Sequence, residues 1–351
     1  MSKTIFVSIA SYRDSNCNKT LESLFANASN PERVFVGICE QNKPGEGSEK
    51  CIGTNTIKHG SNIKIINVDY TDAKGPTWAR YLCSTLWNGE DYFLQVDSHV
   101  LFVKDWDTKC IDMMNGIKKK DGVLHPVLSH YTRNMDDYGK PNENREVPKM
   151  CQSFFNKRGM LSFLGSHVMR SEPDGYERNP YIAAGFLFAE GSFLQDVPFD
   201  PYLDFVFVGE EILLSARAYT SGYDVYGPTE DIVYHLYTRA DEPKIWSDKQ
   251  YSDKVGHEKI RVIMKLKEGD ASVYGRYGMG NKRTIEEFYE FAGIDIKNKK
   301  ILKNFCQVEI DPYFEVQDSV DGEGWKLYKW VWWTVYILII LNILYVIVSI
   351  G

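Results

Sequence analysis

Short apolar runs alternate with amphipathic stretches through the first hundred residues of the chain. The apolar runs lie at 5–10, 34–39, 63–68 and 92–96 and are rich in β-branched and aromatic residues, which is typical of buried strands. Apolar residues recur at helical spacing in 21–28 and in 110–117, and a third helix is predicted over 77–87. This alternation predicts an α/β fold with a mixed, mostly parallel sheet and flanking helices.

The second half of the chain has a less regular pattern. Residues 132–179 are polar and interrupted by Pro, Gly and Asn, which favours long loops of the kind that shape a substrate pocket. Apolar patterning returns at 181–189, followed by a predicted helix over 209–220 and a predicted strand over 231–235. We therefore expect one mixed α/β domain over 1–310.

The C-terminal end carries a nearly unbroken apolar run at 331–350, which follows a predicted linker over 311–330. A helix of this length crosses about 30 Å of hydrocarbon, so we predict a single transmembrane anchor. Lys326 and Lys329 precede the run, and by the positive-inside rule they predict a tail-anchored protein whose domain faces the cytoplasm. The alternative is a buried helix at the end of the globular domain.

Composition bears on two points, whether the protein binds nucleic acid and whether its cysteines are free. The 351 residues have a net charge of −7 and a pI near 5.6, which argues against a broad surface for nucleic acid. The seven cysteines are scattered and form no CxxC pair. This odd number and wide spacing favour free thiols over a zinc site or a disulfide framework.

The sharpest chemical feature is the pair Asp97 and His99, which ends the fourth predicted strand. Side chains two residues apart on an extended segment point to the same side, and ligands of α/β sheets gather at the carboxyl ends of strands. His235 ends a later apolar run and is a third candidate ligand. One carboxylate with two imidazoles suits Mn²⁺ better than Ca²⁺. The alternative is a turn aspartate and two packing histidines.

Two further segments have polar residues where a nucleotide would bind. Ser11, Tyr12, Arg13 and Asp14 follow the first strand and offer groups for a phosphate, a ribose or a base, although Asp14 could equally cap the next helix. Arg80 lies in the first turn of the helix that follows Gly75 and Pro76. It could hold an anionic donor, or the segment could be an ordinary helix start.

Paired acids open the helix predicted over 209–220. Glu210 and Glu211 could stabilise a helix N-terminus, but two acids together are also candidates for holding an acceptor hydroxyl or supporting a developing sugar cation. The sequence has no GxxxxGK[ST] or GxGxxG loop and no Gly-x-Ser-x-Gly elbow. Kinase, dehydrogenase and serine-hydrolase functions are therefore disfavoured.

Taken in order, these motifs resemble the N-acetylglucosaminyltransferases that modify hydroxyproline on the cytoplasmic adaptor of F-box ubiquitin ligases. The resemblance spans 4–295. Its motifs are IFVSIASYRD at 5–14, VGICEQN at 36–42, GPTWAR at 75–80, QVDSH at 95–99, WD at 106–107, AGF at 184–186, FVGEE at 207–211, AR at 216–217, GYD at 222–224, YH at 234–235, YTR at 237–239, YGMG at 277–280 and RT at 283–284.

The resemblance implies a glycosyltransferase-A fold, with a nucleotide-sugar-binding half at 1–107 and an acceptor-binding half at 108–310. It also implies a UDP-GlcNAc donor, a divalent metal that is usually Mn²⁺, and transfer with retention. In the family's pattern Asp97, His99 and His235 match metal ligands, while the 11–14 segment, Arg80 and Asp97 fall where the donor nucleotide is held. Glu210 or Glu211 falls where such enzymes contact the acceptor or the reacting sugar.

The apolar C-terminal run departs from the soluble family's pattern. The acceptor, a protein or a glycan, is therefore either free in the cytoplasm or presented at a membrane surface. A second hypothesis is a membrane-tethered adaptor that binds nucleotide sugar without turnover. A metal-dependent phosphoesterase is a third, but it would usually require more His and Asp ligands for a two-metal site.

Overall fold

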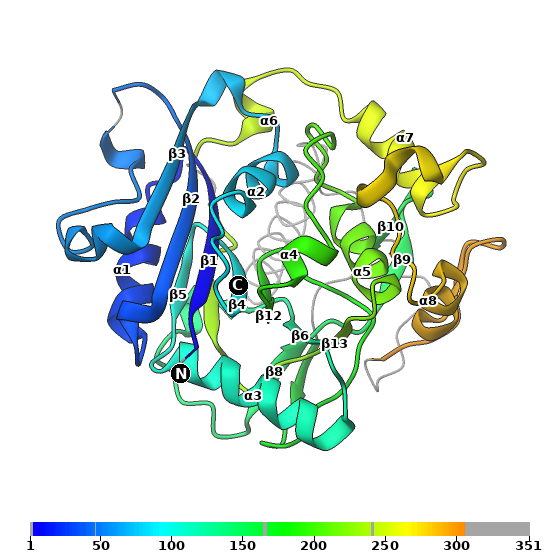
Figure 1. Ribbon diagram of the computed structural model, residues 1–351, viewed down its shortest axis with the longest axis horizontal. Coiled ribbons are helices and arrows are strands. Elements are labelled where there is room, and N and C mark those ends of the chain that lie inside the picture. Colours follow the sequence, from blue (N-terminus) through cyan, green and yellow to red (C-terminus); the bar gives the residue numbers. More distant parts are fainter. Residues whose placement is uncertain (1–2, 46, 164–166, 240–241, 306–351) are drawn as a thin grey trace, which may run out of the picture.

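A seven-stranded sheet forms the centre of the computed structural model, which describes residues 3–45, 47–163, 167–239 and 242–305 (Figure 1). The strand order is β13-β6-β12-β4-β1-β2-β3. Only β12 runs antiparallel to its neighbours β4 and β6. The predicted mixed, mostly parallel sheet is confirmed. Its strands are β1 (Ile5–Tyr12), β2 (Val34–Asn42), β3 (Ile63–Asp69), β4 (Tyr92–Asp97), β6 (Pro126–Ser129), β12 (Phe186–Glu190) and β13 (Asp224–Tyr226).

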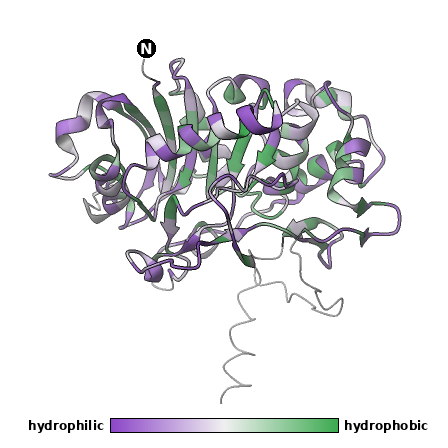
Figure 2. Cartoon of the chain, turned by 90° about the horizontal axis from the view of Figure 1, so that it is seen from below, coloured by the Kyte–Doolittle hydropathy of each residue, from purple (hydrophilic) through white to green (hydrophobic). Residues whose placement is uncertain are grey.

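Helices cover both faces of the sheet because its strands are apolar on both sides. On one face α1 (Cys17–Asn27) and α3 (Trp106–Asp121) pack against alternate residues such as Val7 and Phe188. On the other face α2 (Pro76–Ser84), α4 (Phe193–Asp196) and α5 (Glu210–Thr220) meet the intervening residues, including Phe6 and Leu187. Figure 2 shows the resulting layers, with hydrophobic strands between helices whose outer faces are hydrophilic.

A second hydrophobic cluster lies beside the sheet and is built from residues between 150 and 294. In it α5 packs with α7 (Lys254–Ile263) and α8 (Ile285–Ala292), at the right of Figure 1. The short α6 (Ile245–Asp248) and the 3-10 segment η6 (Ala271–Tyr277) flank α7 in the sequence. Helix α5 therefore belongs to both clusters and joins them, since Leu214 faces the sheet and Leu213 faces α7 and α8.

The expectation of long loops over 132–179 is wrong in part, because short strands punctuate this segment. Strands β8 and β11 pair antiparallel, as do β9 and β10, and β7 joins β14 and β5 in a separate three-stranded sheet. Each has only a few residues, too few for a sequence pattern to show. Their bounds are β5 (Val100–Phe102), β7 (Arg133–Asn134), β8 (Glu146–Lys149), β9 (Ser153–Phe155), β10 (Leu161–Phe163), β11 (His167–Arg170) and β14 (Val233–His235), and the described chain closes with β15 (Ile294–Asp295) and β16 (Lys300–Ile301).

The expectation that the cysteines are free thiols is also wrong for Cys17, Cys51 and Cys151, which are disulfide-bonded. Cys17 at the start of α1 forms a disulfide with Cys51, while Cys39, Cys83 and Cys110 are free and buried. The wide sequence separation of 34 residues hid the pair, because the distance between two cysteines in a fold cannot be read from their spacing alone.

The apolar run at 331–350 lies outside the described residues. Within the part of the chain that is described, no helix combines the length and apolar character that a membrane crossing needs.

Candidate active site

A cavity of about 490 Å³ opens where β1 and β4 end and where α2 and α5 begin. Carboxyl ends of parallel strands and N-terminal ends of helices are the usual location of ligands in α/β folds. Its lining brings together Tyr12, Arg80, Asp97, His99, Glu210, Glu211 and His235 from the sequence-predicted residues. The other three, Ser11, Arg13 and Asp14, lie behind this lining.

Asp97, His99 and His235 each present one ligand atom, and these atoms all lie within 4.8 Å of one another. Strands β4 and β14 position two of these side chains, since β4 ends at Asp97 and β14 ends at His235. The Nε2 atom of His235 lies 3.2 Å from Oδ2 of Asp97. One carboxylate and two imidazoles form a donor set that fits Mn²⁺ or a similar transition ion.

Asp14 lies directly behind His99, and its side chain has no exposed surface. Its Oδ2 atom lies 2.7 Å from Nδ1 of His99, and it also accepts a hydrogen bond from the Ser98 hydroxyl and pairs with Arg239. This arrangement directs Nε2 of His99 away from Asp14, as outer carboxylates commonly do for metal-binding histidines. Asp14 is thus placed to orient a ligand rather than to touch a nucleotide.

Arg80 links the metal-binding candidates to α5. Its guanidinium is buried, lies 3.1 Å from Oδ1 of Asp97 and forms an ion pair with Glu210. Burial alone would raise the pKa of Asp97, but the hydrogen bond from His235 and the charge of Arg80 hold it well below its usual range. Asp97 is therefore ionised at neutral pH, as a metal ligand must be.

Glycines make room for this network. Gly75, at φ +95, turns the chain into α2, and a Cβ there would lie 2.9 Å from the Cα of Phe205. A Cβ on Gly185 would lie 3.1 Å from Oδ2 of Asp97. Both positions favour glycine, one for conformation and close approach and the other for close approach alone.

The two acids of α5 have different environments. Glu210 pairs with Arg80, whereas Glu211 accepts hydrogen bonds from the Ala184 amide at 2.8 Å and the Tyr131 hydroxyl at 2.5 Å. Removal from water raises the pKa of Glu211 to about 7, and these two hydrogen bonds only partly oppose that rise. Glu210 thus forms an ion pair with a buried cation, whereas Glu211 titrates near neutrality.

The 11–14 segment is already engaged by other parts of the chain. Ser11 is fully buried, the Tyr12 hydroxyl donates to Asp248 at 2.8 Å, and Arg13 pairs with Asp248 and Glu49. Asp248 belongs to α6, so this contact fastens α6 to the end of β1 beside the cavity. Of these residues, Tyr12 lines the cavity.

The cavity also contains residues that sequence reasoning did not single out. His130 is buried, and its Nδ1 lies 2.9 Å from the Pro148 carbonyl, while Nε2 has no hydrogen-bond partner among the described residues. Burial lowers the pKa of His130 to about 4, so its ring is neutral at pH 7. Trp246 adds to the aromatic part of the lining, together with Phe207 and Tyr237 from the FVGEE and YTR motifs. His130 and Trp246 belong to no motif, and only the fold brings them to the cavity.

A comparison with one solved structure shows the class of fold. The chain is similar in structure to GalNAc-T7 crystallised with UDP, GalNAc and Mn²⁺, with a TM-score of 0.53 and 13% identity, covering 82% of this chain and 54% of that one. Staphylococcus aureus TarS crystallised with UDP-GlcNAc gives a TM-score of 0.44 and 15% identity over 77% of this chain and 69% of that one. The fold shared with GalNAc-T7 is that of glycosyltransferases of the A type.

The sequence itself gives the narrower assignment. The family model described as Glycosyltransferase (GlcNAc) matches residues 4–58 and 46–298, and the chain belongs to this family. No curated protein sequence matches it. The resemblance seen in the motifs is thus confirmed at the level of the glycosyltransferase family, while specificity for hydroxyproline is a finer statement.

Proposed function

We propose that this protein is a metal-dependent, retaining glycosyltransferase that moves GlcNAc or a related hexose from a UDP-sugar to a hydroxyl acceptor. The observation that carries the proposal is the cluster of Asp97, His99 and His235 in the cavity at the end of β4, joined through Arg80 to Glu210. Membership of the GlcNAc glycosyltransferase family supports it, as does the UDP, GalNAc and Mn²⁺ bound to GalNAc-T7, which has the same fold.

A divalent cation held by Asp97, His99 and His235 would supply positive charge to the leaving diphosphate. Arg80 holds Asp97 and Glu210 in fixed positions through its two ion pairs. Glu210, which Arg80 holds at the edge of the cavity, is suited to support positive charge that develops on the transferred sugar. Glu211, which keeps its hydrogen bonds to Ala184 and Tyr131, positions the start of α5 and the acceptor side of the cavity.

In the same-face route that we propose, the acceptor oxygen attacks the anomeric carbon from the face that UDP leaves, the bond from that carbon to the phosphate oxygen breaks, and the acceptor proton passes to the departing phosphate. This route needs no enzymic nucleophile. We propose a protein hydroxyl as the acceptor, and hydroxyproline is the residue that the family resemblance implies. Attachment to a membrane through 331–350, with the domain in the cytoplasm, remains a separate proposal from the sequence.

The direct test is UDP release, followed by sugar transfer to a hydroxyproline peptide, with UDP-GlcNAc and other UDP-sugars in the presence of Mn²⁺ or EDTA. Asp97→Ala should reduce turnover by about 100-fold or more, since a bound cation contributes several kcal/mol to such reactions. Asp112→Ala, which removes an exposed acid on α3, is the matched control and should keep full turnover. Turnover that survives both EDTA and Asp97→Ala would refute the proposal, and UDP binding without turnover would favour an adaptor.

A further inference from the structure

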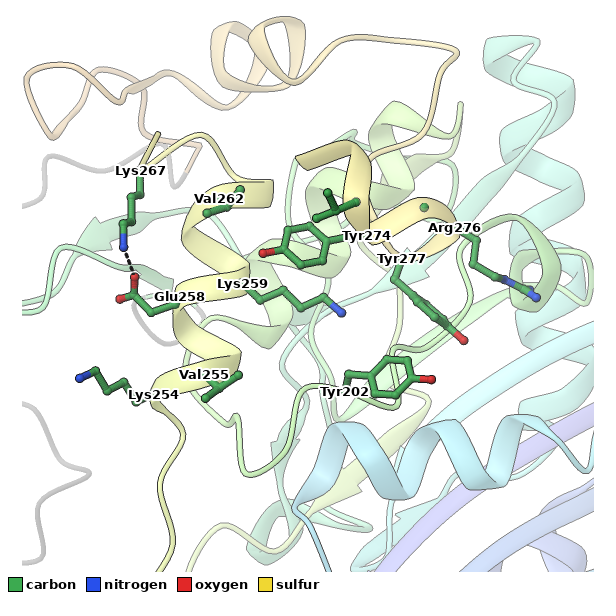
Figure 3. A pocket seen from close by; sticks show the side chains of 12 residues that line it. Tyr202, Lys254, Val255, Glu258, Lys259, Val262, Lys267, Tyr274, Arg276 and Tyr277 are labelled. Carbon is green, nitrogen blue, oxygen red and sulfur yellow. Dashed lines mark hydrogen bonds and ion pairs between the residues drawn. The ribbon is translucent and has the colours of Figure 1, made fainter. Parts of the chain in front are cut away.

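A second pocket of about 1000 Å³ lies between α7 and η6 and shares no lining residue with the catalytic cavity (Figure 3). Three tyrosines surround the ammonium group of Lys259 in it. Its Nζ atom lies 5.5 Å from the ring centroid of Tyr202, 5.0 Å from that of Tyr274 and 5.6 Å from that of Tyr277. The pocket therefore combines aromatic walls with a central cation.

The positive charge of Lys259 is already neutralised, because Lys259 forms an ion pair with the buried Asp200. The pair anchors the lysine, and the three rings pack around the anchored ammonium group by cation–π contact. The backbone behind them is also fixed, since the buried Arg217 donates hydrogen bonds to the carbonyls of Arg276 and Gly278. The walls are thus held in place without any ligand.

The net charge of the pocket is positive. Its one acid, Glu258, is already matched by Arg261 and Lys267. Lys254 and Arg276 have no carboxylate partner within the described part of the chain, and they stand on opposite sides of the pocket in Figure 3. Lys254 and Arg276, with the tyrosine rings between them, can therefore pair with two carboxylates spaced along an extended polypeptide.

The pocket is also apolar at its rim. Val255, Val273 and Tyr202 are 80%, 69% and 68% exposed, which is unusual for large apolar side chains grouped around one cavity. A polyphosphate or a simple anion would leave these apolar groups uncovered. A polypeptide with both acidic and apolar side chains would cover them and match the charge.

The segment 200–209 connects this pocket to the catalytic cavity. Tyr202 lines the outer pocket, and Phe207, five residues later, lines the catalytic one just before Glu210. The segment is packed on α7, since the Nε2 atom of His257 lies 2.9 Å from the Val208 carbonyl. A chain held in the outer pocket would therefore lie close to the acceptor side of the reaction.

We propose that the pocket around Lys259 binds an acidic, apolar-containing polypeptide segment of the acceptor. This inference rests on the proposed transferase function, because an acceptor exists only in a transfer reaction. The pocket would select acceptor proteins by a sequence outside the modified residue, with Lys254 and Arg276 meeting carboxylates and the tyrosines and valines meeting apolar side chains.

The test measures binding of a fluorescein-labelled peptide of alternating glutamate and leucine by fluorescence anisotropy, with the full chain. A peptide of alternating lysine and leucine and inorganic polyphosphate are the comparison ligands. The double variant Lys254→Glu/Arg276→Glu should weaken glutamate-peptide binding by about tenfold or more, because it reverses two rim charges. The double variant Lys104→Glu/Lys119→Glu reverses two exposed lysines next to and within α3, gives the same change in net charge and should bind like the wild type.

Equal weakening by both double variants, or equally tight binding of the lysine peptide, would overturn the proposal. Displacement of the peptide by polyphosphate at a matched charge concentration would reassign the pocket as a general anion site and overturn it too. If the charge reversal prevents folding, Lys254→Gln/Arg276→Gln gives the same comparison with a smaller expected loss. UDP release with UDP-GlcNAc and the hydroxyproline peptide is measured on the same samples without the fluorescein-labelled peptide. An inactive wild type that still binds the labelled peptide through the pocket would count against the transferase and not against the pocket.

Discussion

Asp14 is a buried carboxylate that acts on the site indirectly, through the side chain of His99. Its three partners, His99, Ser98 and Arg239, come from two segments far apart in the sequence. The residue fixes the ring of His99 and leaves Nε2 of His99 for a metal. Its contribution should therefore appear in metal affinity.

We expect Asp14→Asn to weaken Mn²⁺ binding by about 10- to 100-fold, the usual effect of removing an outer carboxylate from a metal-binding histidine. Titration of the variant with Mn²⁺ by calorimetry measures this directly, and Asp112→Asn provides the control. Binding that is unchanged in Asp14→Asn would show that His99 keeps its orientation without this partner.

Glu211 makes stability depend on pH in a direction opposite to that of most acids. Its pKa is raised to about 7 in the folded protein, so between pH 4.5 and 7 the folded state binds more protons than the unfolded state. The free energy of unfolding should therefore fall as pH rises through this window, by up to about 3 kcal/mol. Urea unfolding at pH 5 and pH 8 measures the change.

Glu211→Gln is the matched variant, because the amide cannot ionise and keeps one acceptor for the Ala184 amide. The difference in stability between pH 5 and pH 8 should shrink in this variant. A pH dependence identical to that of the wild type would assign the effect to another group.

At the scale of single residues, spacing predicted part of the site. Asp97 and His99 could be paired from the sequence because a strand places residues two apart on one side. His130 and Tyr131 could not be predicted, since their role depends on burial and on partners such as Pro148 and Glu211 that lie far away in the chain. Asp14 was singled out, but only its burial distinguishes an orienting role from a direct contact.

At the scale of elements, the start of α2 depends on one glycine. Gly75 adopts a left-handed conformation and lies against the backbone of Phe205, which belongs to the segment between the two pockets. The Phe205 amide also donates to the Lys74 carbonyl at 2.6 Å. The entry to α2, and with it Arg80, is thus coupled to the segment that leads to Glu210.

We predict that Gly75→Ala destabilises the protein by more than the roughly 1–2 kcal/mol that the left-handed conformation alone costs an alanine, because the added Cβ would also meet Phe205. Gly89→Ala separates these two effects, since Gly89 has φ +90 and open space around its Cβ. Denaturant unfolding of both variants gives the comparison. If both variants lose the same free energy of unfolding, the backbone near Phe205 can move away from the added Cβ at little cost.

The elements that the sequence predicted well are those with long apolar patterns. The four N-terminal strands and helices α1, α3 and α5 each contain enough buried positions to show a period. Strands β7 to β11 have no such signal, because two to four residues carry no period and their partners are set by tertiary pairing. The strand at 231–235 and the candidate ligand His235 were predicted, but the pairing of β14 with β5 and β7, which brings His235 to Asp97, was not.

At the scale of the whole molecule, the Cys17–Cys51 disulfide closes a loop that contains β2. Closing a loop of 34 residues stabilises a protein by about 3–4 kcal/mol in the chain-entropy model. Reduction should lower the midpoint of thermal unfolding, and reductant should lower it by less in the Cys17→Ser/Cys51→Ser protein, in which Cys151 is still disulfide-bonded. If reductant lowers the midpoint equally in both proteins, the Cys17–Cys51 disulfide does not contribute this stability.

The same bond bears on where the domain resides. Disulfides persist in oxidising compartments and are rare in the cytosol, whereas Lys326 and Lys329 favour a cytoplasmic domain. Alkylation of free thiols in intact cells, followed by mass spectrometry of the Cys17 and Cys51 peptides, decides between the two. Quantitative alkylation of both residues would support the cytoplasmic orientation.

The reversed strand β12 has a consequence for how this gene can be divided. Because β12 lies in 108–310 and pairs with β4, which lies in 1–107, neither of these two ranges contains the complete sheet. A fragment that ends at 107 would expose the edge of β4, and unpaired edges favour aggregation. The two fragments should be recovered as soluble protein only when they are produced together, so the halves of this chain have to be inherited and expressed as one unit.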